Sequence, residues 1–209
     1  GKDTALDFRE VAPRAATRDM FVRDGKADPA LSLDGALSVA VPGAVRGYLT
    51  LHRTSGKLPL AKVAAPAIRA ARQGFVVTPE FVDAATERLS CLGQDAEAAV
   101  IFLSRRPGGS WAAPAVGSVL KQEALARTLE VLAREGDLPF HQGRIARAIV
   151  DSVRVKGGVL TLEDLKAWQP RPHPPLEGSY RGHRVLTMPP PSAGGITVLQ
   201  TLGVLERAG

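Results

Sequence analysis

Apolar residues recur three and four positions apart through the middle of the sequence, and this spacing predicts a series of helices. The first covers residues 42–55, with Pro42 near its start and Gly56 just past its end. Its predicted inward face carries Val45, Tyr48, Leu49 and His52. Because His52 shares this apolar face, we interpret it as a packed histidine and not as a ligand.

A second helix is predicted over residues 60–73, with Gly74 as a suitable C-terminal cap. One face carries Leu60, Val63, Ala64, Ala67, Ile68 and Ala71. Pro66 falls inside this helix, where it removes a backbone hydrogen bond and clashes with the preceding turn. We therefore expect Pro66 to kink the helix or to restart it.

A third helix is predicted over residues 79–92, because Thr78 is a good N-cap and Pro79 suits the first helical position. Gly93 is the expected terminator. Cys91 lies near the end of this helix, and we interpret it as a small core residue.

The later sequence alternates loop and helix signals. Residues 104–118 are rich in glycine and proline and predict a loop. Apolar residues at helical spacing then predict two helices, one through Leu125, Leu129 and Leu132 and one through Ile145, Ile149 and Val153. Thr161 and Asp164 form a predicted capping box that opens a further short helix.

The character of the chain changes near residue 170. Prolines and alternating residues predict a β segment near residues 172–190, with a turn near Gly182, and a helix follows. The Gly194-Gly195 pair matches the spacing of neither common phosphate-binding glycine motif, so we assign it no phosphate site. Residues 1–209 are predicted to form one incomplete domain of α+β class, with a helical lobe at about 42–168 and the β segment and final helix at about 172–208.

Composition restricts the classes of partner. The 209 residues carry a formal charge of +6, but the basic residues are scattered and only 5% of residues are aromatic. This pattern disfavours a nucleic-acid groove, so a basic helical nucleic-acid-binding module is a remote alternative. A single cysteine, Cys91, excludes an internal disulfide and a cysteine-based zinc site. We predict no metal and no cofactor, and no apolar run approaches the about 18 residues of a membrane span.

A compact charged cluster stands out in LDFREVAP, residues 6–13, where Asp7 and Glu10 flank Arg9. Such a cluster can be a local salt bridge that stabilises a turn. It can also hold a guanidinium ready for an anionic ligand. The residues alone leave both interpretations open.

Seven segments, taken in order and at their spacing, resemble the γ-glutamyltransferases, also called glutathione hydrolases. They are DFREVAP at 7–13, VPGAVRGY at 41–48, LPLAKVAAPAIRAARQGF at 58–75, GRIARAIV at 143–150, GGVLTLEDLKAW at 157–168, YRGHRV at 180–185 and MPPPSAGG at 188–195. The resemblance covers nearly the whole chain. It implies the mostly helical part of an N-terminal-nucleophile hydrolase with an αββα core.

The resemblance also implies a chemistry. In this family a precursor cleaves itself, and the new N-terminal threonine of the small subunit attacks a γ-glutamyl amide such as that of glutathione. The acyl-enzyme is then resolved by water or by an amino acid. No threonine of this sequence is followed by histidine, as the family's nucleophile motif requires. We therefore expect a portion of the large subunit, with no catalytic residue in this chain and the small subunit as its partner. The resemblance further implies a periplasmic or extracellular location.

One ligand-binding residue carries over from the family. The arginine of its D-x-R-E-x-A-P motif binds the α-carboxylate of the γ-glutamyl group, and here that residue is Arg9. Asp7 and Glu10 are then expected to orient Arg9 or to cap the adjoining backbone. The nearest alternative function is a related acylase or amidohydrolase of the same superfamily, which acts on a different amide.

Overall fold

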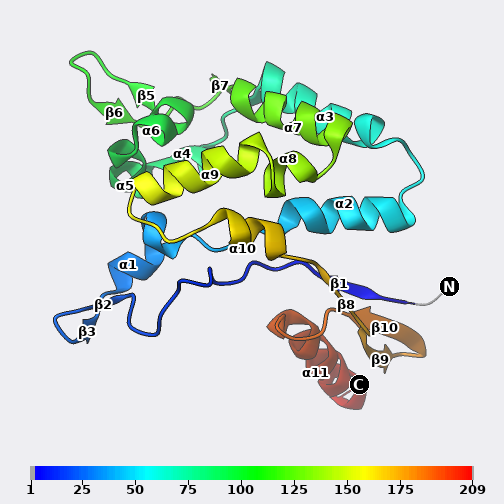
Figure 1. Cartoon of the computed structure of the whole chain (residues 1–209). Helices are drawn as coiled ribbons and strands as arrows, with labels where there is room; N and C mark the ends of the chain where they lie inside the picture. Colours follow the sequence, from blue (N-terminus) through cyan, green and yellow to red (C-terminus); the bar gives the residue numbers. More distant parts are fainter. Residues whose placement is uncertain (1–2, 209) are drawn as a thin grey trace.

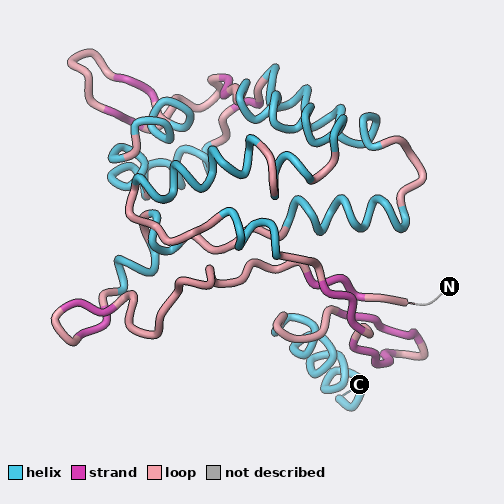
Figure 2. The backbone as a smooth tube through the Cα atoms, viewed as in Figure 1, coloured by secondary structure: helices cyan, strands magenta, loops and turns pink. Residues whose placement is uncertain are grey.

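Helices dominate the computed structural model, which describes residues 3–208, and the strands among them are short (Figures 1 and 2). The helices are α1 (Pro29–Leu33), a 3-10 turn (Ala36–Ser38), α2 (Ala44–Ser55), α3 (Leu60–Gln73), α4 (Pro79–Glu87), α5 (Leu89–Gln94), α6 (Ala96–Phe102), α7 (Glu123–Glu135), α8 (Leu138–His141), α9 (Arg144–Val155), α10 (Leu162–Ala167) and α11 (Ala193–Ala208). The strands are β1 (Ala5–Asp7), β2 (Val22–Arg23), β3 (Lys26–Ala27), β4 (Phe75–Val76), β5 (Ser104–Arg105), β6 (Trp111–Ala112), β7 (Val119–Leu120), β8 (Arg171–His173), β9 (Leu176–Tyr180) and β10 (His183–Thr187).

The described strands pair two by two, and every pair is antiparallel. β1 pairs with β8, so the start of the chain lies beside residues 171–173. β9 and β10 form a hairpin that turns at Arg181 and Gly182, both with positive φ. Figure 1 shows β1, β8, this hairpin and α11 together on one side of the helical part. The predicted β segment near 172–190 is therefore confirmed, although short strands occur elsewhere as well.

Helix α2 ends where predicted, and the amide of Gly56 donates to the carbonyl of His52 there, but the helix begins at Ala44, two residues after Pro42. The predicted inward face was partly wrong. Tyr48 is 62% exposed, whereas Arg46 is only 4% exposed. His52 is half-buried, and its Nε2 lies 2.8 Å from the carbonyl oxygen of Leu58.

Helix α3 is continuous through Pro66, so of the two expected outcomes, a kink or a restart, the restart does not occur. Pro66 itself is exposed, while Ala64 and Ile68 are half-buried and Ala71 is buried on the face that packs on α7. Tertiary packing of this face holds the helix together across the proline. Arg72 adds an ion pair to Glu130 of α7, with 2.7 Å between Nη1 and Oε1.

The predicted helix over 79–92 is two helices in the structure. Thr78 caps α4 as expected, accepting a hydrogen bond from the amide of Phe81. However, α4 ends before Arg88, and Gly93 lies inside α5 and does not terminate it. Cys91 is only half-buried, and its Sγ lies 3.6 Å from Asp34 Oδ1, so it is not a core residue.

Helix α6 was not predicted from the sequence, nor was the hairpin of β5 and β6 inside the expected loop at residues 104–118. Asp95 starts α6, because its Oδ1 accepts from the amides of Glu97 and Ala98 at 3.0 and 3.1 Å. Around these elements lies a small core of Ala85, Ala99 and Leu103, with Phe81, Leu89, Leu92, Trp111 and Ala113 packed against it.

The main core lies where α9 and α10 meet the segment before α2. Its buried residues are Val41, Ala146, Val150, Leu160, Leu165 and Trp168, and Phe8 packs against them. The predicted capping box is present: the amide of Asp164 donates to Thr161 Oγ1 at 3.2 Å, and the amide of Thr161 donates to Asp164 Oδ2 at 3.0 Å.

Asp164 does more than cap α10. Its Oδ1 accepts a hydrogen bond of 3.0 Å from the amide of Arg14, 150 residues away. Burial would raise the pKa of Asp164, but the hydrogen bonds from Arg14 and Thr161 outweigh burial and hold that pKa below its ordinary value. This carboxylate therefore fastens the segment after Arg9 to α10.

A buried arginine fastens α2 to the rest of the helical part. Arg46 Nε donates to Asp137 Oδ2 at 2.7 Å, and its Nη1 donates to the carbonyls of Lys166 and Trp168. Arg53 donates to the other oxygen of Asp137 at 2.9 Å. Burial would raise the pKa of Asp137, but these two guanidinium groups hold it below its ordinary value. The start of α2 is thereby fixed relative to α8 and α10.

Candidate functional site

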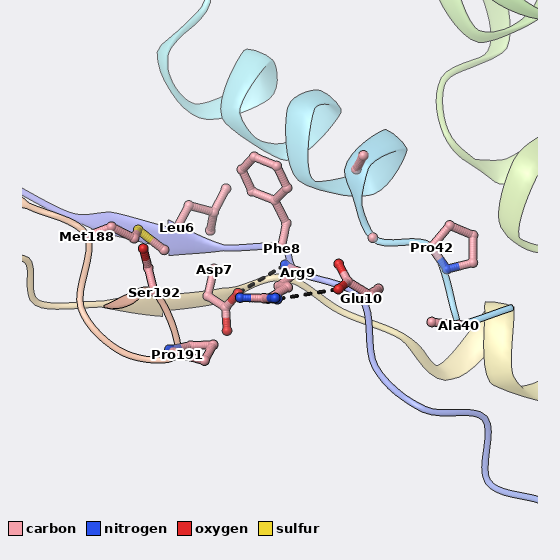
Figure 3. Close-up of a pocket in the computed structure, with 12 residues that line it drawn as sticks. Leu6, Asp7, Phe8, Arg9, Glu10, Ala40, Pro42, Met188, Pro191 and Ser192 are labelled. Atoms are coloured by element: carbon pink, nitrogen blue, oxygen red, sulfur yellow. Dashed lines mark hydrogen bonds and ion pairs between the residues drawn. The ribbon is translucent and has the colours of Figure 1, made fainter. Parts of the chain in front are cut away.

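A pocket of ≈ 690 Å³ lies where the Arg9 segment, the start of α2 and the loop between β10 and α11 meet (Figure 3). Three parts of the chain that are far apart in sequence supply its walls. Its lining residues are Leu6, Asp7, Phe8, Arg9, Glu10, Ala40, Pro42, Gly43, Ala44, Met188, Pro191 and Ser192. All three predicted site residues, Asp7, Arg9 and Glu10, are thus brought to one cavity.

Asp7 and Glu10 do not both form salt bridges with Arg9 in the described structure. Asp7 Oδ1 accepts from the backbone amide of Arg9 at 3.0 Å, so Asp7 caps the backbone and does not neutralise the guanidinium. Arg9 Nε and Glu10 Oε1 are 3.4 Å apart, and the two side chains are 60% and 55% exposed. Among the described residues, this long contact is the ion pair of Arg9. Within residues 3–208, most of the guanidinium donors therefore make no hydrogen bond and are available for a ligand.

The direction of Arg9 follows from the strand that precedes it. Successive side chains of an extended segment point to opposite sides. Figure 3 shows Phe8 directed toward α2 and Arg9 on the other side of the backbone, between Asp7 and Glu10. Pairing of Asp7 with Arg171 across β1 and β8 holds the segment in place at its start.

The start of α2 forms a second wall. Gly43 is the N-cap and makes no side-chain capping hydrogen bond, and Ala44 begins the helix. Both residues line the pocket. A helix N-terminus carries partial positive charge, so this wall adds to the attraction that Arg9 exerts on an anionic group.

The third wall is the loop of Met188, Pro191 and Ser192, at the start of α11. Gly195 allows α11 to come this close, because a Cβ at Gly195 would lie 2.0 Å from the carbonyl oxygen of Met188. The packing role of Gly195 was not predicted, because in the sequence this glycine suggested only a phosphate loop. Phe8 and Ser192 were not predicted either, since their only signal was their presence in the segments at 7–13 and 188–195.

The described residues contain no group of three or more His, Cys, Asp or Glu side chains that could hold a metal ion. Over the same residues, 3–208, no helix is long and apolar enough to cross a membrane. A guanidinium in the pocket is chemically suited to bind an anion, because it offers several hydrogen-bond donors and a positive charge.

Comparisons with known proteins support a specific family. The family model described as gamma-glutamyltranspeptidase matches residues 1–209. A glutathione hydrolase proenzyme of Escherichia coli (strain K12) is 38% identical over 99% of this chain. An acylase ACY 1 proenzyme of Pseudomonas sp. (strain V22) is 36% identical, also over 99% of this chain. The chain spans 35% and 37% of these two relatives, about a third of their length.

The fold agrees with the sequence match. A crystal structure of Helicobacter pylori gamma-glutamyltranspeptidase superposes with a TM-score of 0.89 and 33% identity, covering 100% of this chain and 59% of that chain. The predicted fold, an α+β part of an N-terminal-nucleophile hydrolase, is confirmed by this likeness. The family model and the solved structure both cover the whole chain, and this chain therefore belongs to the gamma-glutamyltranspeptidase family.

Proposed function

We propose that the complete protein is a γ-glutamyltransferase and glutathione hydrolase, and that this chain is part of its large subunit. The observation that carries the proposal is Arg9, which lines the ≈ 690 Å³ pocket with a largely unpaired guanidinium. Arg9 would bind the α-carboxylate of the γ-glutamyl donor, and the donor would lie between the Arg9 segment and the loop at residues 188–192.

The chemistry of the guanidinium fits this role. A guanidinium fork matches a carboxylate with two parallel charge-assisted hydrogen bonds, which a lysine cannot reproduce. Asp7 would support the role by fixing the backbone amide of Arg9, and Glu10 by its contact with Arg9 Nε. The helix N-terminus at Gly43 would favour the same negative charge.

The nucleophile is not assigned to any residue of this chain. We propose that a precursor is cleaved and that an N-terminal threonine of a small subunit attacks the γ-glutamyl amide, in keeping with relatives that are named proenzymes. The free α-amine of that threonine would act as the general base. The acyl group would then pass to water or to an amino acid.

A related acylase is the second candidate, because one relative of similar identity is named an acylase. The two functions differ in what the pocket must recognise. A γ-glutamyl donor presents an α-carboxylate to Arg9, whereas a general amide substrate need not. The exposure of Arg9, whose contact with Glu10 is long at 3.4 Å, favours the γ-glutamyl donor.

The test compares three versions of the complete precursor: the wild type, Arg9→Lys and Arg9→Ala. Steady-state kinetics are measured on a γ-glutamyl anilide and on the matching 4-aminobutyryl anilide, which lacks the α-carboxylate. Losing a charge-assisted hydrogen bond costs about 1.5–3 kcal/mol, so Arg9→Lys should lower kcat/KM for the γ-glutamyl donor by about one to two orders of magnitude. Cleavage of the precursor, followed on a gel, should continue.

Two results would count against the proposal. A processed Arg9→Lys enzyme with wild-type kcat/KM on the γ-glutamyl donor would make Arg9 a structural residue. Equal kcat/KM of the wild-type enzyme on the two anilides would favour the acylase.

A further inference from the structure

We propose that Phe8 is a positioning residue for Arg9. We also propose that positions 43 and 47 are glycines because any larger residue would overlap Phe8 where it packs on α2. The inference rests on the proposed function, in which Arg9 binds the donor's α-carboxylate. It concerns how the guanidinium is aimed, and it assigns a role in specificity to a side chain that need not touch the substrate.

The side-chain contacts of Arg9 cannot aim it. Its contact with Glu10 is 3.4 Å long and joins two side chains that are each more than half exposed. Exposed ion pairs of this kind hold a long side chain only weakly. The short contact is instead at the backbone, where the amide of Arg9 donates to Asp7 at 3.0 Å. The direction of the guanidinium must therefore be set by the backbone at residues 8 and 9.

The ring of Phe8 is seated directly on α2. A Cβ added at Gly47 would lie 2.2 Å from Phe8 Cγ and 2.4 Å from Phe8 Cβ. Distances this short leave no room for any side chain at position 47. The Phe8 ring therefore rests on the bare backbone of the helix.

The backbone of Phe8 is seated as closely as its ring. A Cβ added at Gly43 would lie 2.2 Å from the carbonyl oxygen of Phe8 and 2.3 Å from Trp168 Cζ2. That carbonyl belongs to the peptide bond whose nitrogen is the amide of Arg9. Gly43 and Gly47 are four positions apart and so lie on one face of the chain that enters α2. The peptide between Phe8 and Arg9 is thereby pressed on a rigid surface.

Tyr48 also packs against Phe8 and completes its packing surface, which we call the Phe8 seat (Gly43, Gly47 and Tyr48). Its ring centroid lies 5.1 Å from that of Phe8 at an interplanar angle of 56°, a favourable tilted arrangement. The helix beneath is itself fixed, because Arg46 is buried and paired with Asp137. Since Phe8 and Arg9 point to opposite sides of the backbone, fixing the first aims the second into the pocket (Figure 3).

The test measures discrimination between two donors in the complete, processed enzyme. The quantity is the ratio of kcat/KM for the γ-glutamyl anilide to kcat/KM for the 4-aminobutyryl anilide. This ratio reports recognition of the α-carboxylate, and a general loss of folded or active enzyme leaves it unchanged. Gly47→Ala adds one methyl group, favours the helix by its propensity, and must displace Phe8. We expect it to lower the ratio by about tenfold, since a small misplacement of a binding group is costly.

A matched control is Gly93→Ala in α5, where the added Cβ meets Trp111 Cδ1 at an ordinary distance of 3.7 Å. It should keep the wild-type ratio. Tyr48→Ala is the second variant, because Tyr48 is largely exposed and its removal frees Phe8 without filling any space. It should lower the ratio about threefold, and it decides the question if Gly47→Ala enzyme is not processed or not soluble.

The variant Arg9→Ala distinguishes failure of the positioning role of Phe8 from failure of the proposed function. If Arg9→Ala collapses the ratio while Gly47→Ala and Tyr48→Ala keep it, the positioning role of Phe8 is overturned and the proposed function stands. If the Phe8-seat variants lower kcat/KM for both donors equally, their effect is structural and the positioning role is again overturned. If Arg9→Ala itself keeps the ratio, the proposed function fails, and the positioning role fails with it.

Discussion

Arg46 Nε donates to Asp137 Oδ2 at 2.7 Å, although the two residues are 91 positions apart in the chain. The two side chains are only 5% and 13% exposed. Nη1 of Arg46 donates to the carbonyls of Lys166 and Trp168, so this guanidinium joins α2, α8 and α10. The pocket wall at the start of α2 depends on this contact, because Phe8 packs against Gly43 and Gly47 there.

Asp137→Asn should destabilise the protein strongly. The substitution leaves the buried guanidinium of Arg46 without its counter-charge, and breaking such a pair costs about 3 kcal/mol or more. Urea unfolding at pH 7 measures the free energy. The control is Asp151→Asn, an exposed residue of α9, which should change stability by no more than about 0.5 kcal/mol. Equal stability of the two variants would mean that the Arg46 pair contributes nothing.

Stability should fall as the pH is lowered through the ordinary histidine range, because of His141. This side chain is fully buried, and its Nδ1 donates to the carbonyl of Leu165 at 3.0 Å. Burial, and then the positive charge of Arg46, lower the pKa of His141 below its ordinary 6.5, and these effects outweigh the Leu165 bond and the Asp137 charge. Below pH 6.5, His141 is protonated in the unfolded chain but stays neutral in the folded protein until the pH falls to its lowered pKa.

The stability linked to His141 is therefore complete above the unfolded pKa and is lost as the pH falls toward the folded one, by at most about 1.4 kcal/mol per pH unit. Unfolding measured from pH 8 to pH 5 should show this slope in the wild type. His141→Asn, which retains a donor, should reduce it, and His183→Asn, at an exposed site in β10, should not. An unchanged slope in His141→Asn would assign the pH dependence to other groups.

Asp7→Ala and Asp7→Asn should differ in activity. Asp7 contributes an acceptor for the backbone amide of Arg9, and asparagine retains such an acceptor whereas alanine does not. Loss of one hydrogen bond is worth about 1 kcal/mol, so Asp7→Ala should lower kcat/KM on the γ-glutamyl anilide by about fivefold. Asp7→Asn should remain close to the wild type. If both variants lose activity equally, the charge of Asp7 matters and its capping role does not.

The two neighbouring glycines of α11 should respond oppositely to alanine. A Cβ at Gly195 would lie 2.0 Å from the backbone oxygen of Met188, whereas a Cβ at Gly194 would lie 3.7 Å from Ser192 Oγ. Gly195→Ala should cost about 1–3 kcal/mol through overpacking. Gly194→Ala should be neutral or slightly stabilising. Thermal unfolding of the pair checks this, and a tolerated Gly195→Ala would show that α11 can move away from the pocket.

Local signals made parts of this fold predictable. Gly56 ends α2 as expected, and Thr161 and Asp164 form the expected capping box, because a cap depends on residues a few positions apart. At Pro66 the same reasoning allowed a kink or a restart, and the restart does not occur in α3, which packs on α7. This reasoning failed at Gly93, because the helix boundary depends on Asp95 as the next N-cap.

Features of the site that depend on residues far apart in the sequence could not be predicted. The motif around Arg9 was visible in the sequence, and the structure brings Asp7, Arg9 and Glu10 to one pocket. Spacing placed Tyr48 on the buried face of α2 and gave no reason to bury Arg46, because the partners of Arg46 lie near residues 137 and 166–168. The Phe8 seat was likewise invisible, since nothing local links position 8 to position 47.

The pairing of β1 with β8 also determines when the pocket can be completed during synthesis. Arg9 leaves the ribosome before β8, Met188 and Ser192, which emerge much later. Helices such as α2 can form in the meantime from local contacts, but β1 has no partner strand until residues 171–173 are exposed. Pairings between distant segments are the slow steps of folding. The pocket around Arg9 therefore cannot close before most of this chain has been translated, and a ribosome-stalled chain that ends before β8 should carry helices without a pocket.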